Sequence, residues 1–188
     1  MQEAAAGKRL LFFVDAAHFV HGAFLGYLWC FVRLFVPSSA GRKRFNVLGA
    51  LNAVTLEVLT VVNESYINSA TVCQLLTQIA QRYPGQLITL VLDNARYQRC
   101  ALVQRHAAAL GIELLFLPAY SPHLNLIERF WRFVRKRTLY SQHYATFADF
   151  KTAIDSCIQT AHRDHHDQLS TLLTWNFQSF EKVQTLPV

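Results

Sequence analysis

The sequence predicts a single α/β domain, residues 1–188, in which a mixed five-stranded sheet is flanked by helices. Two observations predict this fold class. Short β-prone apolar runs cluster in the first part of the chain, and strand and helix patterns alternate in the rest. The 188 residues, of which 52% are hydrophobic, can bury one sizeable core, and no repeat or long linker divides them.

The first part of the chain predicts strands. Residues 10–14 form a short apolar run, and the aromatic and β-branched residues at 27–36 predict a second strand. After the turn "PSSAGRKR", residues 45–62 predict two further strands, separated by a break at residues 52–55. Together with the strand at 27–36, these two strands are expected to form an antiparallel three-stranded meander.

The middle of the chain predicts a helix followed by a βαβ unit. Apolar residues spaced by three and four predict a helix at residues 68–83, which a Pro-Gly pair ends. A strand at residues 87–92, a helix at 97–110 and a strand at 113–117 follow. These elements extend the sheet beyond the meander.

The last part of the chain predicts helices. Ser121 is a candidate N-cap, with Pro122 in the first turn, of a helix that begins at Ser121 or shortly after. Two more helices, at residues 146–161 and 166–180, are expected to pack over the sheet and form a C-terminal helical region of about residues 146–182. The resulting order of elements is the layout of a ribonuclease-H-like fold.

Three acidic residues are the candidate catalytic and metal-binding residues. Asp15 and Asp93 each follow an apolar strand, so each carboxylate is expected at a strand's C-terminal end, and Glu128 is expected on a helix. Three converging carboxylates repel one another unless a cation lies between them, and an all-oxygen ligand set suits Mg²⁺ or Mn²⁺. The pattern predicts phosphoryl transfer with two such ions.

The charge balance predicts a polyanionic partner. Lys and Arg number 18 against 12 Asp and Glu, which gives a net charge of +6. Much of this charge is local, and phosphate contacts there would be salt-dependent and largely independent of sequence. The candidate nucleic-acid contacts are Arg42, Lys43 and Arg44 in "GRKR", and Arg129, Arg132, Arg135, Lys136 and Arg137 directly after Glu128.

Several neighbouring residues have two interpretations each. Asn94 either positions a ligand or caps the backbone, and Tyr120 is a candidate for stacking on unpaired bases. His18 and His21 form D-x-x-H-x-x-H with Asp15, but imidazole is a poor Mg²⁺ ligand. A supporting role is therefore left for His18, and packing or a surface position is expected for His21. Trp131 could also stack on bases, but it lies on an apolar helical stripe that predicts burial.

The segments "VDAAH", "LVLDNARYQ" and "LPAYSPHLNLIERFW" resemble those of the catalytic domain of Tc/mariner-superfamily DDE transposases, in particular bacterial insertion-sequence members. The 34 residues between Asp93 and Glu128 and the Tyr-Ser-Pro-x-Leu-Asn approach match that family. The resemblance covers roughly residues 10–158 and identifies Asp15, Asp93 and Glu128 as the catalytic triad. His18 matches a common family histidine, whereas Leu126 replaces a common proline.

The resemblance implies metal-dependent DNA strand cleavage and strand transfer into TA sites, by a homodimer on double-stranded element ends and target. Relatives carry helix-turn-helix modules before this domain, but only 14 residues precede Asp15 here. The chain is therefore expected to be a frameshift partner of an upstream helix-turn-helix polypeptide, a truncated remnant, or a product with a misassigned start.

Two other functions remain open from the sequence. One is a host nuclease or junction resolvase on the same fold, and the other is a non-catalytic remnant that binds nucleic acid. The four cysteines form no CxxC pair, and no signal peptide or membrane-spanning run is evident. The chain is expected in the bacterial cytoplasm, associated with the nucleoid when it acts, and away from membranes.

Overall fold

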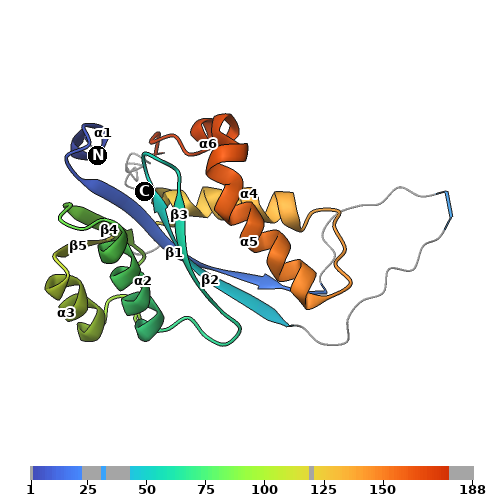
Figure 1. The fold of residues 1–188 in the computed structure, drawn as a ribbon, viewed down its shortest axis with the longest axis horizontal. Helices are drawn as coiled ribbons and strands as arrows, with labels where there is room; N and C mark the ends of the chain where they lie inside the picture. The colour runs from blue at the N-terminus through green and yellow to red at the C-terminus, as the bar shows by residue number, and fades with distance from the viewer. Residues whose placement is uncertain (1, 23–30, 33–42, 119–120, 178–188) are drawn as a thin grey trace, which may run out of the picture.

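The computed structural model describes residues 2–22, 31–32, 43–118 and 121–177, which form one five-stranded sheet with helices on both faces (Figure 1). The strand order is β3-β2-β1-β4-β5. The strands are β1 (Leu10–Val20), β2 (Arg44–Asn52), β3 (Val58–Asn63), β4 (Ile88–Leu92) and β5 (Ile112–Phe116). The helices are α1 (Gln2–Ala5), α2 (Ser69–Arg82), α3 (Ala101–Ala109), α4 (Leu126–Thr138), α5 (Phe147–Asp164) and α6 (His166–Leu172), with a short 3₁₀ helix at Pro122–Leu124.

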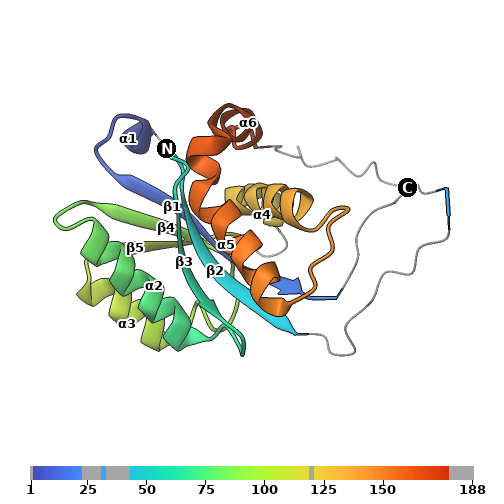
Figure 2. The same cartoon turned by 45° about the vertical axis from the view of Figure 1, so that its right-hand side comes forward.

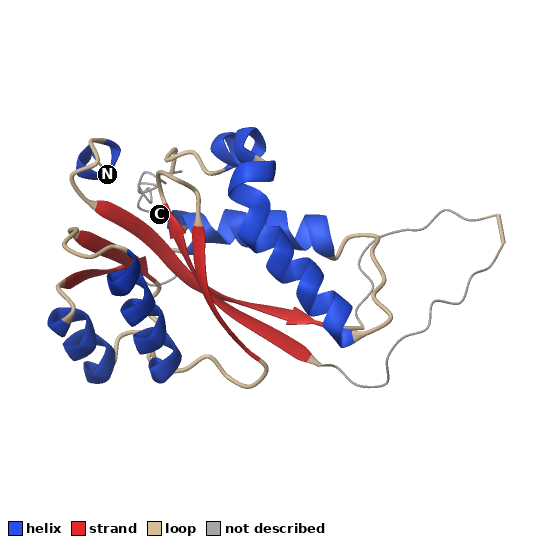
Figure 3. Cartoon of the chain, in the orientation of Figure 1, coloured by secondary structure: helices blue, strands red, loops and turns tan. Residues whose placement is uncertain are grey.

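The sheet is mixed because its two halves connect differently. β1 pairs antiparallel with β2, which pairs antiparallel with β3, whereas β1, β4 and β5 run parallel. Figure 3 shows the strands as one twisted sheet, with β1 and β2 extending beyond the other strands. The predicted mixed five-stranded α/β sheet is therefore confirmed.

Alternation along β1 sends side chains into two separate cores. Phe12 and Val14 pack with residues of α2 and α3, whereas Phe13 and Ala17 pack with residues of α4, α5 and α6. The two views in Figures 1 and 2 agree with this division, with α2 and α3 on one face of the sheet and α4 and α5 on the other. Odd-numbered and even-numbered residues of β1 therefore point to opposite faces of the sheet.

The predicted end of the first strand and the predicted composition of the meander need correction. β1 does not end at residue 14 but continues to Val20, where it pairs with the start of β2. The predicted strand at 27–36 falls outside the described residues, apart from Phe31 and Val32, which are not in a strand. Because β2 lies between β1 and β3, the meander consists of β1, β2 and β3, with no place beside β2 for another strand.

The helix prediction is confirmed for α2, whereas α3 begins at Ala101 rather than at residue 97 and the start of α4 is also corrected. Asn68 caps α2 through a capping box, as its position before the apolar pattern requires. Ser121 and Pro122 do not begin α4, since Pro122 begins the 3₁₀ helix and the N-cap of α4 is Asn125. The proline at 122 therefore shapes the approach to α4 rather than its first turn.

The C-terminal helical region is confirmed for α5 and is shorter than predicted for α6. α6 ends at Leu172 rather than continuing toward residue 180. The backbone that follows is held instead by Arg129 of α4, whose guanidinium donates to the carbonyls of Thr174 and Asn176 at 2.9 and 3.1 Å. None of the described helices is long and apolar enough to cross a lipid bilayer.

Candidate metal centre

Asp15, Asp93 and Glu128 come together in the structure. One carboxylate oxygen from each lies within 4.8 Å of the other two, and all three residues are partly buried. They come from β1, from the residue after β4, and from the first turn of α4. Three elements that are distant in sequence therefore supply one cluster of oxygen donors.

The parallel pairing of β1 with β4 brings the two aspartates together. The paired segment ends with Val14 opposite Leu92, so Asp15 and Asp93 are the next residues on neighbouring strands. The prediction that Asp15 ends its own strand is wrong, because β1 continues beyond it along β2. Asp15 lies at the carboxyl edge of the parallel half of the sheet, which is where α/β sheets place their sites.

Close packing of α4 on the sheet brings Glu128 to the aspartates. Gly49 of β2 lies opposite Asp15, and a Cβ there would come within 2.7 Å of the Trp131 ring and 3.1 Å of Ile127. The missing side chain lets α4 approach the sheet at the level of Asp15. Glu128 lies in the first turn, where the helix dipole stabilises negative charge.

The electrostatics of the cluster favour a bound cation. Burial, then the nearby Glu128 carboxylate and, more weakly, that of Asp93 raise the pKa of Asp15 from 3.8 to about 7, although Arg135 opposes this. The donors are all oxygens, which suits a hard divalent cation such as Mg²⁺ or Mn²⁺. The residues therefore fit the cation that the sequence predicts.

Two further residues adjoin the carboxylates and were missed from the sequence. Asn125 donates through Nδ2 to the Asp93 carboxylate at 3.2 Å and to the Val14 carbonyl at 3.1 Å. Burial, followed by the charges of Asp15 and Asp93, raises the pKa of the Tyr97 hydroxyl. Both residues lie inside the sequence segments that contain Asp93 and Glu128, and that position was the available signal.

The three supporting residues have different positions. The side-chain oxygen Oδ1 of Asn94 accepts a hydrogen bond from the Arg99 guanidinium at 2.9 Å. His18 differs from Asp15 by an odd number of strand positions and therefore lies on the opposite face of β1, where it pairs with Asn46. Tyr120 lies outside the described residues.

His21 and Trp131 are packing residues, as predicted. His21 is buried, pairs with the carbonyl of Tyr144 and contacts the rings of Phe147 and Phe150. Trp131 is 1% exposed, which excludes stacking on a base in this conformation.

The basic residues of α4 divide into two groups. Arg129 binds backbone carbonyls, Arg135 lies over the Phe19 ring, and Arg137 pairs with His165. Arg132 and Lys136 are exposed and line a groove of about 580 Å³ between α4 and α6. These two residues are the α4 cations best placed for an external anion.

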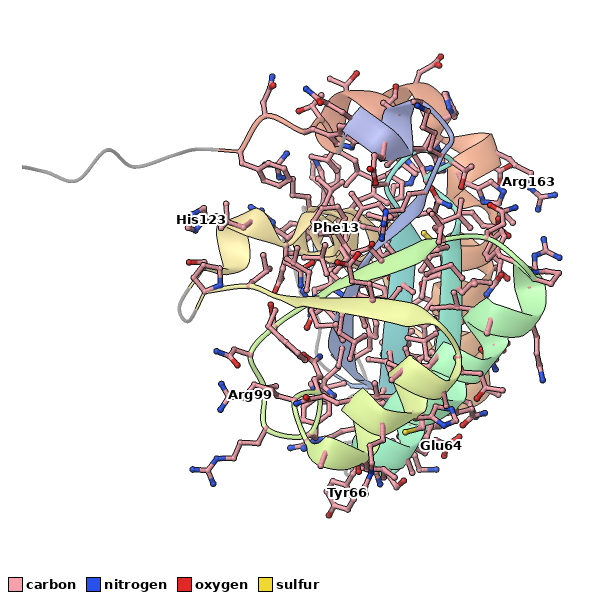
Figure 4. All side chains as sticks on the ribbon, turned by 90° about the vertical axis from the view of Figure 1, so that its left-hand side faces the viewer. Phe13, Glu64, Tyr66, Arg99, His123 and Arg163 are labelled. Carbon is pink, nitrogen blue, oxygen red and sulfur yellow. The ribbon has the colours of Figure 1, made fainter. Side chains whose placement is uncertain are left out.

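Lys43 and Arg44 of the "GRKR" segment lie away from the carboxylates. Arg42 is outside the described residues, whereas Lys43 and Arg44 are exposed. Arg44 pairs with Val20, five residues along β1 from Asp15, or roughly 17 Å at the rise of a strand. Lys43 and Arg44 line a pocket together with Glu64 and Tyr66. Figure 4 shows Glu64 and Tyr66 well away from His123, which lines the groove between α4 and α6.

The family model that matches the chain is that of a DDE superfamily endonuclease, over residues 11–151. No curated protein matches the sequence. Among solved structures, the Mos1 transposase catalytic domain with raltegravir and Mn superposes with a TM-score of 0.59 at 14% identity, covering 93% of this chain and 85% of that one.

Two other structures extend the comparison. The Mos1 strand transfer complex gives a TM-score of 0.58 at 15% identity over 93% of this chain, which spans 56% of that transposase chain. The HTLV-2 integrase catalytic core with magnesium, in a dimeric form, superposes with a TM-score of 0.52 at 11% identity, covering 82% of this chain and 86% of that one. These similarities show the fold, and the predicted ribonuclease-H-like architecture is confirmed.

Proposed function

Because the chain belongs to the DDE superfamily of endonucleases, we propose that it is a transposase catalytic domain in which Asp15, Asp93 and Glu128 are the catalytic residues. The observation that supports this most directly is the convergence of the three carboxylates within 4.8 Å, from three separate elements. Chance placement of acidic residues would not bring together the three positions that the sequence motifs single out.

The carboxylates would hold Mg²⁺ or Mn²⁺, and we propose two ions per site. Bound there, the ions would activate the attacking oxygen and stabilise the leaving oxygen of a phosphodiester. Solved structures with the same fold are described with manganese and with magnesium. Bound cations would also offset the burial and the repulsion from Glu128 and Asp93 that together raise the pKa of Asp15.

The chain's own residues would align the DNA strand for an in-line displacement. In the first step a water oxygen bonds to phosphorus and the bond to the 3′ oxygen breaks, which leaves a 3′-hydroxyl. In the second step the oxygen of that hydroxyl bonds to a phosphorus of the target strand, and the bond from this phosphorus to the target's own 3′ oxygen breaks, which leaves a 3′-hydroxyl on the target. We propose that Arg132 and Lys136, which line the groove between α4 and α6, bind phosphates of the DNA, and the charge of Arg135 lowers the pKa of Asp15.

The biological setting belongs to the same proposal. We propose a bacterial insertion-sequence element, insertion at TA sites, a homodimer acting on paired DNA ends, and a cytoplasmic, nucleoid-associated location. The Mos1 structures include a paired-end complex and a strand transfer complex. The chain spans 56% of the Mos1 transposase chain in the strand transfer complex, and we propose that an upstream helix-turn-helix polypeptide or a frameshift fusion recognises the ends.

The test is DNA nicking and strand transfer by the protein at low salt with Mg²⁺ or Mn²⁺. Supercoiled DNA reports nicking, and a labelled duplex with a free 3′-hydroxyl reports joining to a TA-containing plasmid. We expect both activities to need the metal and to be lost in Asp93→Asn. Asp155→Asn is the matched control, because it makes the same change on an exposed part of α5.

Other outcomes would select other functions. Nicking of branched DNA or RNA–DNA hybrid without joining would indicate a host nuclease or resolvase. DNA binding that is unchanged in Asp93→Asn, with no cleavage by either protein, would indicate a non-catalytic nucleic-acid-binding remnant. Equal cleavage by wild type and Asp93→Asn would refute the assignment of the triad.

A further inference from the structure

Asn125 connects the three elements that supply the carboxylates. It is 1% exposed, and its Nδ2 donates both to the carbonyl of Val14 at 3.1 Å and to Oδ1 of Asp93 at 3.2 Å. Val14 directly precedes Asp15, and the Asn125 carbonyl accepts the backbone N–H of Glu128 at 3.1 Å. One residue therefore contacts Asp93 itself and the backbone beside each of the other two carboxylates.

The orientation of the Asn125 amide follows from its partners. A carbonyl and a carboxylate oxygen can only accept, so the nitrogen must face both of them. The amide oxygen finds no hydrogen-bond partner among the described residues. Burial of an amide whose oxygen has no partner costs free energy of folding. The two hydrogen bonds that the amide nitrogen donates offset this cost.

Asn125 also gives up the usual role of a residue at its position. It is the N-cap of α4, where an asparagine side chain ordinarily accepts a hydrogen bond from the second or third N–H of the helix. Here the side chain makes no such bond and is turned toward the sheet instead. At this position the two N–H donors of the asparagine amide make the contacts, and its oxygen does not cap the helix.

We propose that Asn125 is a positioning residue that fixes the three carboxylates relative to one another and sets the affinity of the site for a divalent cation. The proposal rests on the proposed function, because it assumes that these carboxylates bind the ion. Donation to one Asp93 oxygen holds that carboxylate in one orientation, as partners of metal ligands commonly do. The bond to Val14 holds the start of α4 against β1.

Two variants test the proposal. Asn125→Ala removes both donors, and Asn125→Ser keeps a good helix cap but has a shorter side chain with a single donor, which cannot serve both acceptors. We expect Mn²⁺ binding, measured by titration calorimetry without DNA, to weaken by about tenfold in both. The Mn²⁺ concentration that half-saturates nicking should rise in parallel, and high Mn²⁺ should restore much of the rate.

Ile154→Val separates positioning from a general loss of stability. Ile154 is a fully buried α5 residue outside the candidate centre, so this variant loosens the core without touching the carboxylates. It should bind Mn²⁺ like wild type. Affinity within twofold of wild type in folded Asn125→Ser would overturn the inference alone. Unchanged Mn²⁺ binding in Asp93→Asn would overturn the proposed function, and the inference with it.

Discussion

At the scale of single residues, the triad was predictable but its surroundings were not. Asp15 and Asp93 follow apolar strands and Glu128 follows a recognisable motif, so local sequence is enough to find them. Asn125 is recognised only by its bonds to Val14 and Asp93, which are 111 and 32 residues away. His18 is close to Asp15 in sequence, yet strand alternation places it on the other face.

The raised pKa of Asp15 predicts how stability depends on pH without metal. The folded protein holds this proton up to about pH 7, whereas the unfolded chain releases it near 3.8. The carboxyl therefore stabilises the fold fully below pH 3.8, and this contribution is lost as the pH rises toward 7, by roughly 4 kcal/mol at most. Thermal unfolding in EDTA should show Asp15→Asn gaining stability relative to wild type as pH rises.

Asp155→Asn serves as the control for this pH series, because the carboxyl of Asp155 is exposed. It should follow the wild-type pH dependence. An Asp15→Asn protein with the wild-type pH dependence would show that burial and the neighbouring carboxylates do not raise the pKa of Asp15 in the metal-free fold.

At the scale of elements, the sequence patterns predicted helices and strands but not where β1 and α6 end or where α3 and α4 begin. β1 continues past Asp15 because β2 pairs with its second half, a long-range partner that periodicity in β1 cannot reveal. α4 begins at Leu126 rather than near Ser121 because the side chain of Asn125 is bound to the sheet. In both places tertiary contacts override a local signal.

The seating of α4 depends on Gly49, which predicts a coupled effect of two substitutions. In Gly49→Ala the added Cβ would lie 2.7 Å from Trp131 Cζ2, so α4 must shift. We expect a loss of about 1–3 kcal/mol in the free energy of unfolding, measured with urea, and weaker Mn²⁺ binding. Trp131→Phe removes the opposing atoms, so the double variant should lose less than the sum of the two single losses. Simple additivity would mean that this contact does not seat α4.

The division of charge on α4 predicts which cations bind DNA. Arg132→Gln and Lys136→Gln should each weaken duplex binding and reduce the slope of log K against log salt by about one. Arg105→Gln removes the same charge from an exposed position on α3, on the other face of the sheet, and should leave the slope unchanged. Equal effects from all three variants would indicate a response to net charge rather than a DNA path along α4.

At the scale of the whole molecule, the sequence predicted the fold class, but it predicted only some of the segments that form the strands of the sheet. Alternating patterns and the spacing of the acidic residues led to the mixed five-stranded sheet. The strand expected at 27–36 falls mostly outside the described residues, and the meander expected to include it is formed by β1, β2 and β3 instead. The strand that completes the sheet is β3, on the outer side of β2.

Metal binding should stabilise the whole fold if the three carboxylates bind it. Mn²⁺ at a hundred times its dissociation constant should add about 2.7 kcal/mol, which corresponds to a rise in Tm of roughly 5–10 °C for a chain of this size. Scanning calorimetry with and without EDTA measures this shift. Asp93→Asn should lose most of it, and Asp155→Asn should retain it in full.

The strand order β3-β2-β1-β4-β5 also sets when the centre can form during folding. β1 and β2 are joined through nearby sequence, but β1 meets β4 only after a loop of more than 60 residues closes, since Leu10 pairs with Ile88. Contacts of this span slow folding, and Glu128 arrives later still along the chain. During synthesis, the growing polypeptide therefore holds one aspartate, then two, and gains the complete centre only when α4 docks. A catalytic domain of the kind we propose would therefore be unable to cut DNA until α4 has docked.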